Sequence, residues 1–211
     1  MAKTTKQVKG LSSSDIEFLY IRGLDIRQRV IYLNSPKPNV SGEENIIDAA
    51  IADLFERNLH LLLSQDRKRK LTVVMNVSGG DDGNGWKIYD AIRGSPAKVD
   101  IIVKGSAFSM GTVILQAGDK RILDPNAQLM VHDGELDGSV GTLRDTRSYL
   151  DLLLKKCDKM YNIFAERSGR TREYWAGKCQ GDFYMTAEMA IKEGLADKVM
   201  PPTRRLPSPR I

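Results

Sequence analysis

The chain has few cysteines, few histidines and no long apolar segment, and each shortage excludes a class of protein. Its 211 residues include two cysteines, Cys157 and Cys179, and two histidines, His60 and His132. The cysteines form no metal-binding spacing with the distant histidines, so we expect reduced thiols, a cytoplasmic location and no metal site. No stretch approaches the roughly 20 apolar residues that span a bilayer, and the basic first residues lack the apolar part of a secretory signal. We therefore expect neither a membrane protein nor a secreted one.

The net charge is small once the two ends are set apart. The whole chain carries +5, but residues 1–10 hold three lysines and residues 201–211 hold three arginines, with no acid in either segment. Subtracting those six charges from +5 leaves −1 for the part between them. The internal basic run, Arg67 to Lys70, lies where a helix is expected to give way to a strand. We interpret it as a solvated connection and expect no nucleic-acid partner.

Strand and helix patterns alternate between the polar ends. We expect mobile segments at 1–14 and 201–211 around one domain, residues 15–200, long enough for a substantial core. Ser41, followed by Glu44, has the pattern of a capping box at the start of the first predicted helix. The alternation favours an α/β fold with a largely parallel sheet. Apolar runs and helical spacing predict strands at 29–33, 71–76, 99–104 and 128–132, and helices at 42–64, 84–93 and 109–117.

A long amphipathic helix is expected after these elements, from about residue 141 to residue 167. Its apolar residues recur every three, four or seven positions, and Gly169 follows its end. This apolar face can pack on its own domain, or the helix can project and pack on a neighbouring subunit. Further on, Thr186 is expected to cap a last helix that ends at Gly194, with residues 195–200 returning as an edge strand.

Ser109, His132 and Asp182 each stand in a context that suits one catalytic role. Ser109 follows an apolar strand and begins a helix, so its hydroxyl is expected to lie beside N–H groups that favour negative charge. His132 ends a second apolar run, and Asp182 precedes an apolar-aromatic stretch. An alcohol becomes a nucleophile when a base takes its proton and a carboxylate orients that base. The three residues are therefore candidates for nucleophile, general base and orienting acid.

Each candidate also has an interpretation that needs no catalysis. A serine in this place can be a helix N-cap, and a lone histidine can be a hydrogen-bonded core residue. His60 falls inside the predicted helix 42–64, where we expect a structural or solvent-facing role. Other acids could replace Asp182, namely Asp90, Asp133 and Asp145. The residue types alone leave the catalytic set open.

Several short motifs, taken in order, resemble those of the Clp protease proteolytic subunit, ClpP. Paired glycines and Ser-x-Gly patterns are common, so no single motif is specific, but their order and spacing make the resemblance strong. It runs from about Arg29 to Val199. The motifs are Asn76-Val77-Ser78-Gly79-Gly80, Ile88-Tyr89-Asp90, Gly105-Ser106-Ala107-Phe108-Ser109-Met110-Gly111, Pro125-Asn126, Met130-Val131-His132, Gly181 to Glu188 and Gly194 to Val199.

The resemblance implies a crotonase-type fold of βαβ repeats with a long projecting helix, and an ATP-dependent serine endopeptidase that needs no cofactor. It implies Ser109, His132 and Asp182 as catalytic residues, with the backbone N–H groups of Gly80 and Met110 as the oxyanion hole. The implied partners are unfolded polypeptide substrates, further copies of the chain in seven-membered rings stacked as a tetradecamer, and an AAA+ unfoldase or adaptor. Strand-like pairing of the substrate gives the binding candidates Gly79, Asp81, Asp82, Asp133, Gly134 and Glu135.

The chain departs from the family pattern where substrate and partners are concerned. Asp81 and Asp82 replace aliphatic residues. Their side chains can point to solvent, or they can face the substrate groove, in which case we expect a preference for Lys or Arg near the scissile bond. Gly181 replaces an Arg that usually joins the two rings, which predicts a weaker double ring. The apolar pocket that usually receives the unfoldase contains a hydroxyl and two charges in this chain, so weak docking is expected. Its six positions map to Thr72, Val74, Ile102, Lys104, Ile122 and Asp124.

Two other functions share this fold. One is an acyl-CoA enzyme of the crotonase superfamily, which works with acid and base carboxylates. The other is a non-catalytic ring subunit that only supports an active partner. The presence of serine, histidine and aspartate together argues against both.

Overall fold

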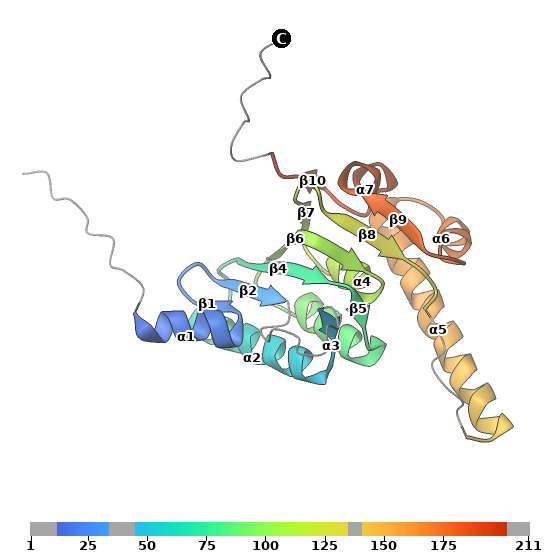
Figure 1. The fold of residues 1–211 in the computed structure, drawn as a ribbon, viewed down its shortest axis with the longest axis horizontal. Helices are drawn as coiled ribbons and strands as arrows, with labels where there is room; N and C mark the ends of the chain where they lie inside the picture. Colours follow the sequence, from blue (N-terminus) through green and yellow to red (C-terminus); the bar gives the residue numbers. More distant parts are fainter. Residues whose placement is uncertain (1–11, 34–44, 135–140, 202–211) are drawn as a thin grey trace, which may run out of the picture.

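The computed structural model describes residues 12–33, 45–134 and 141–201, and Figure 1 shows how their elements are arranged. The helices are α1 (Ser13–Arg22), α2 (Ala49–Gln65), α3 (Asp82–Arg93), α4 (Met110–Leu115), α5 (Leu143–Ser168), α6 (Arg172–Lys178) and α7 (Ala187–Glu193). The strands are β1 (Leu24–Asp25), β2 (Val30–Leu33), β3 (Ile46–Ile47), β4 (Leu71–Val77), β5 (Gly79–Gly80), β6 (Val99–Phe108), β7 (Lys120–Leu123), β8 (Gln128–Val131), β9 (Phe183–Thr186) and β10 (Lys198–Val199).

The main sheet is mostly parallel, as the alternation of patterns predicts. Strands β2, β4, β6, β7 and β10 pair in that order, all in parallel. The long strand β6 pairs with β7 through its first half and with β8 through its second half. Strand β9 then adds to β8 in the antiparallel direction. The chain therefore has the predicted α/β fold, and the divided strand β6 carries the sheet out to the region of Ser109.

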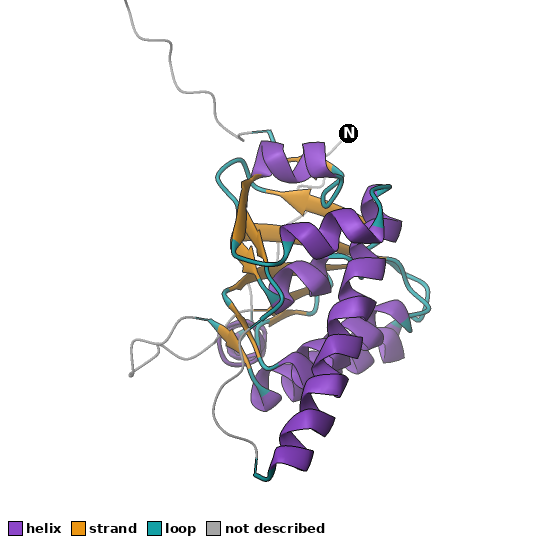
Figure 2. Cartoon of the chain, turned by 90° about the vertical axis from the view of Figure 1, so that its right-hand side faces the viewer, coloured by secondary structure: helices purple, strands orange, loops and turns teal. Residues whose placement is uncertain are grey.

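Buried and half-buried side chains alternate along the strands, and the buried ones lie on the face of the sheet that helices cover. Residues of β4 from Leu71 to Val77 are buried and half-buried in turn. The buried ones share a core with Phe55, Leu59 and Leu62 of α2. Burying each large apolar side chain contributes about 1.5–3 kcal/mol, so a register shift of one residue would be costly. Figure 2 shows helices gathered mainly on one side of the strands, with α5 extending past them.

Helix α2 begins later than the sequence predicts. Its N-cap is Asp48, whose Oδ1 accepts a hydrogen bond from the Ile51 N–H at 2.8 Å. Residues 46–47 form strand β3, which pairs in parallel with Gly79–Gly80. The prediction of helix from residue 42 was therefore wrong for the described residues 45–48. Ile46 and Ile47 form strand hydrogen bonds instead, and Asp48 caps the helix. Ser41 and Glu44 lie outside the described residues.

The N-terminal helix α1 was not predicted. Ser12 caps it in a capping box with Asp15, and Gly23 ends it in the left-handed conformation at φ 58°. The helix begins inside the segment 1–14 that we expected to be mobile, and the domain limit at residue 14 stays a prediction. Its outer side chains Ile16, Tyr20 and Ile21 are exposed.

Helix α5 agrees closely with the predicted long helix. It covers Leu143–Ser168, with a capping box of Thr142 and Asp145 at its start and Gly169 in the left-handed conformation at its end. Figure 1 shows the N-terminal part of α5 extending away from the sheet as an arm. This arm carries exposed apolar side chains, which are Leu143, Tyr149, Leu150, Leu152 and Leu154.

Candidate active site

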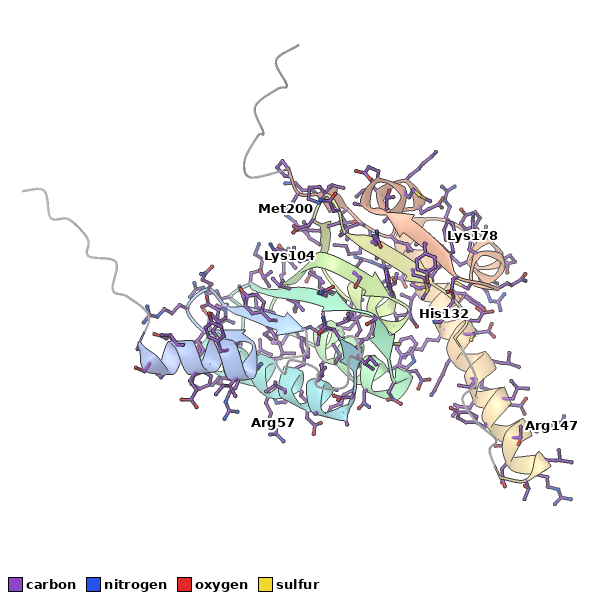
Figure 3. The ribbon with its side chains drawn as sticks, in the orientation of Figure 1. Arg57, Lys104, His132, Arg147, Lys178 and Met200 are labelled. Atoms are coloured by element: carbon purple, nitrogen blue, oxygen red, sulfur yellow. The ribbon has the colours of Figure 1, made fainter. Side chains whose placement is uncertain are left out.

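The three triad candidates meet because neighbouring strands end together. Ser109 directly follows β6, and its N–H donates to Met130 O of β8 at 2.8 Å. His132 directly follows β8. The antiparallel pairing of Val131 with Phe183 brings the next residue, His132, opposite Asp182, which directly precedes β9. In Figure 3 the labelled His132 lies where the sheet meets the base of the α5 arm.

The side chains form a continuous chain of contacts. His132 Nε2 lies 2.7 Å from Ser109 Oγ, a hydrogen-bonding distance. His132 Nδ1 lies 3.2 Å from Asp182 Oδ1. Each ring nitrogen therefore has one partner, which is the arrangement in which an imidazole accepts a proton from a hydroxyl while a carboxylate orients it. The structure brings together the three residues that the sequence singled out.

The backbone at Ser109 is unusual for a residue with a side chain. Its φ of 50° and ψ of −119° fall in a region that glycine adopts readily and other residues rarely do. The sharp turn separates the end of β6 from the start of α4, so the hydroxyl lies between the two elements. Ser109 makes no side-chain cap hydrogen bond to α4. The Ser109 hydroxyl therefore does not cap the helix, although the residue occupies the N-cap position.

The paired glycines pass directly beside Ser109. A Cβ added at Gly79 would lie 2.9 Å from Ser109 Cβ, and one added at Gly80 would lie 2.4 Å from Ile47 O. Both residues have positive φ, 112° and 134°. Strand β5 thus needs glycine at both positions to fit between β3 and the serine. The Met110 backbone follows Ser109 as the first residue of α4, and the Met110 side chain is buried.

The acids that follow the paired glycines both have partners within the fold. Asp81 is the N-cap of α3, and its Oδ1 accepts from the Asn84 N–H at 2.7 Å. Asp82 Oδ2 accepts from Lys156 Nζ of α5 at 2.6 Å. Their preference for basic substrates stays a prediction, and these contacts oppose it because each carboxylate already has a donor. Glu135 lies outside the described residues, and roles for Gly79, Asp133 and Gly134 in substrate binding also stay predictions.

Asp133 fixes the segment that carries His132. Its N–H donates to Cys179 O at 2.8 Å, and its Oδ1 accepts a hydrogen bond from the Tyr161 hydroxyl of α5. Burial is the main cause that raises the pKa of Tyr161, and the contact with the Asp133 carboxylate raises it further. The hydroxyl therefore keeps its proton and remains a donor. Asp133 is therefore engaged with α5, whereas Asp182 is the acid that contacts the imidazole. Nothing in the local sequence pairs Tyr161 or Lys156 with residues so far away in the chain.

The remaining candidates from the sequence lie elsewhere. Asp145 belongs to the capping box of α5, and Asp90 is an exposed residue of α3. His60 is exposed on α2, as expected. Burial raises the pKa of Cys157, and it raises the pKa of Cys179 to about 12, so neither thiol provides a thiolate at neutral pH. These placements leave Ser109 as the nucleophile candidate beside a base.

The described part of the chain offers no obvious place for a metal ion or a membrane span. It contains no group of three or more His, Cys, Asp or Glu side chains arranged to hold a metal. In the same residues, no helix combines the length and the apolar character needed to cross a bilayer.

Comparison with known proteins decides the family. A family model described as Clp protease matches residues 27–203. The chain belongs to the Clp protease family. It is also 31% identical, over 181 residues, to the ATP-dependent Clp protease proteolytic subunit of Deinococcus radiodurans, an alignment that covers 85% of this chain and 83% of that protein. Membership in this family supports a peptidase role, and it confirms the resemblance that the sequence motifs carry.

Proposed function

We propose that the chain is a serine endopeptidase that hydrolyses unfolded polypeptides through a Ser109–His132–Asp182 triad. The observation that carries this proposal is the 2.7 Å contact between Ser109 Oγ and His132 Nε2, completed by Asp182 on the other ring nitrogen. A second support is the protonated state of the thiols, which leaves no competing nucleophile of that kind in the described residues. Membership in the Clp protease family supports peptides as the substrates.

In the proposed reaction, Ser109 Oγ attacks the carbonyl carbon of a peptide bond while His132 Nε2 takes the hydroxyl proton. The same nitrogen then donates that proton to the leaving amine, and an acyl-enzyme ester remains on Ser109. Water, activated by His132, hydrolyses the ester and restores the serine. Asp182 orients the imidazole and stabilises its charged form without taking the proton. The N–H groups of Gly80 and Met110 would bind the oxyanion, where one donor is typically responsible for about 10²–10³ in rate.

Labelling with a fluorophosphonate tests this proposal directly. The reagent forms a covalent bond with an activated serine, so intact mass measurement should show one adduct per chain, and peptide mapping should place it on Ser109. A crotonase-type acyl-CoA enzyme or a non-catalytic subunit has no activated serine and would remain unlabelled. Unmodified protein after prolonged treatment would contradict the proposal.

We propose further that copies of the chain assemble into seven-membered rings stacked in pairs, so that the sites face an enclosed chamber. The exposed apolar side chains of the α5 arm support this proposal, because a second copy of the chain would cover them. Leu143 is 91% exposed and Leu154 is 56% exposed. Apolar surface of this extent on an isolated helix marks an interaction site. Gly181, in place of the usual arginine, makes the contact between rings weaker than is usual in the family.

The double variant Leu150→Ala/Leu153→Ala is expected to separate the rings without unfolding the subunits. Leu150 is 41% exposed and Leu153 is half-buried on the arm, so their truncation removes contact with a partner more than it disturbs the core. Light scattering should show a smaller particle, while the thermal midpoint of the separated subunits stays near that of the wild type. Lys155→Ala, an exposed change on the same helix, is the control. A wild-type monomer at micromolar concentration with full activity would contradict ring assembly.

We propose that this protein docks the usual AAA+ unfoldases poorly, and that it works alone, with a dedicated adaptor or in a mixed ring. Lys104 Nζ of β6 and Asp124 Oδ2, directly after the neighbouring strand β7, lie 3.6 Å apart, so two of the six pocket positions form an ion pair. Figure 3 places Lys104 on the side of the sheet away from Arg57 of α2. An apolar anchor inserted here would have to displace or desolvate this pair, a cost of several kcal/mol.

Degradation of a folded, tagged substrate with a standard unfoldase and ATP is expected to be slow. Replacing the pair with leucines, Lys104→Leu/Asp124→Leu, should increase the rate, because the pocket then becomes apolar. Hydrolysis of a short peptide, which needs no unfoldase, serves as the control and should be equal in both proteins. Rapid degradation by the wild type, abolished by deleting the docking loops of the unfoldase, would refute weak docking.

A further inference from the structure

Tyr184 lies beside the candidate triad. It lies on β9, two residues after Asp182, and its hydroxyl donates to Asp182 Oδ2 at 3.1 Å. The other oxygen of that carboxylate, Oδ1, is the one that lies 3.2 Å from His132 Nδ1. The Tyr184 ring meets the ring of Phe108, the residue before Ser109, edge to face with centroids 5.6 Å apart. One tyrosine therefore touches the acid and the residue that precedes the nucleophile.

The acid of the triad needs a second contact because it is not protected by burial. The Asp182 side chain is 50% exposed, whereas that of His132 is 18% exposed. Water can therefore compete for either carboxylate oxygen, and a carboxylate bonded through one oxygen can still turn about its side-chain bonds. Bonds to both oxygens fix its plane. A supporting hydrogen bond of this kind is how a catalytic group is held within the small tolerance that catalysis allows.

The ring orientation and the protonation state of Tyr184 both suit it to hold the Asp182 carboxylate. Phe108 holds the ring at 90° to its own, an arrangement that aromatic pairs prefer. The hydrogen bond to Asp182 raises the pKa of Tyr184, so the hydroxyl remains protonated and remains a donor at neutral pH. Asp182 directly precedes β9 and lies two residues before Tyr184, a spacing at which extended backbone turns side chains to the same side, so the hydroxyl can reach back to the carboxylate.

We propose that Tyr184 is a positioning residue, whose hydroxyl holds the Asp182 carboxylate in the orientation that the imidazole of His132 requires. The inference rests on the proposed function, because it gives Tyr184 a part in orienting the general base. It involves no contact with the substrate. Tyr184 acts through Asp182, and its removal affects the chemical step more than substrate binding.

The variant Tyr184→Phe tests the proposal because it removes the hydroxyl and keeps the ring against Phe108. We expect kcat for a short fluorogenic peptide to fall about tenfold with KM unchanged, since the lost interaction serves the chemical step. The rate of fluorophosphonate labelling should fall by the same factor. In an Asp182→Ala background, the same tyrosine change should alter the labelling rate by less than about twofold, because the carboxylate that it orients is gone.

Tyr174→Phe is the matched control. It also removes a tyrosine hydroxyl that donates to a carboxylate, Glu193 Oε2 at 2.7 Å, away from the triad, and it should leave kcat unchanged. The proposal is overturned if Tyr184→Phe behaves like this control, if it raises KM alone, or if it slows labelling equally with and without Asp182. Retained activity in Ser109→Ala would instead overturn the serine-peptidase function. An inactive Ser109→Ala with an unaffected Tyr184→Phe would overturn only the positioning role.

Discussion

Replacement of Ser109 with alanine is expected to lower peptidase turnover by at least about 10⁴-fold, because the proposed attacking oxygen is removed. His132→Ala should cause a loss of similar size, and Asp182→Asn a large but smaller one. The double variant Ser109→Ala/His132→Ala should be no worse than either single variant, since the residues act as a unit. Initial rates with a fluorogenic peptide measure all four.

His60→Ala is the control for this series. His60 is exposed on α2, away from the strand ends that carry the triad, so its loss should leave turnover unchanged. Comparable thermal midpoints across the series would show that the losses are not caused by unfolding. Wild-type turnover in Ser109→Ala would refute the serine mechanism.

Replacement of Gly80 with alanine is expected to lower kcat by about 10²–10³-fold while the subunit remains folded. The added Cβ would lie 2.4 Å from Ile47 O and 2.5 Å from Ile47 N, so β5 must move away from β3. That movement would displace the Gly80 N–H that we propose as an oxyanion donor. Steady-state kinetics should show the loss in kcat, and circular dichroism should show retained secondary structure.

Gly177→Ala provides the matched control for a glycine change. Gly177 lies in α6, where an added Cβ would meet no heavy atom within 4 Å apart from the neighbouring residues and the backbone of the helix itself. Alanine there should be tolerated and should slightly favour the helix. Unchanged kcat in Gly80→Ala would mean that the position of β5 does not matter for catalysis.

The sequence predicts the features that depend on neighbouring residues. The apolar runs that become β4 and β6, the helical spacing of α5 and the cap at Thr186 are all local patterns, and all are confirmed. The start of α2 is different, because it depends on pairing between Ile46–Ile47 and Gly79–Gly80. No pattern around residue 42 contains information about a strand more than 30 residues away.

The same distinction explains what was missed around the site. Ser109, His132 and Asp182 could be named from local context and family motifs, and the strand ends bring them together. The contacts of Lys156 with Asp82 and of Tyr161 with Asp133 join residues far apart in sequence. The position of Tyr184 two residues after Asp182 could have suggested that both side chains lie on the same side of the strand. The hydrogen bond between them becomes evident only in the structure.

The backbone conformation of Ser109 has a consequence for evolution of the protein. A side-chain-bearing residue at φ 50° and ψ −119° costs about 1–3 kcal/mol relative to an unstrained conformation. Glycine would remove that cost and, with it, the hydroxyl. Selection for thermal robustness and selection for turnover therefore favour different residues at position 109. A lineage that no longer needed catalysis would be expected to lose the serine early and gain stability by doing so.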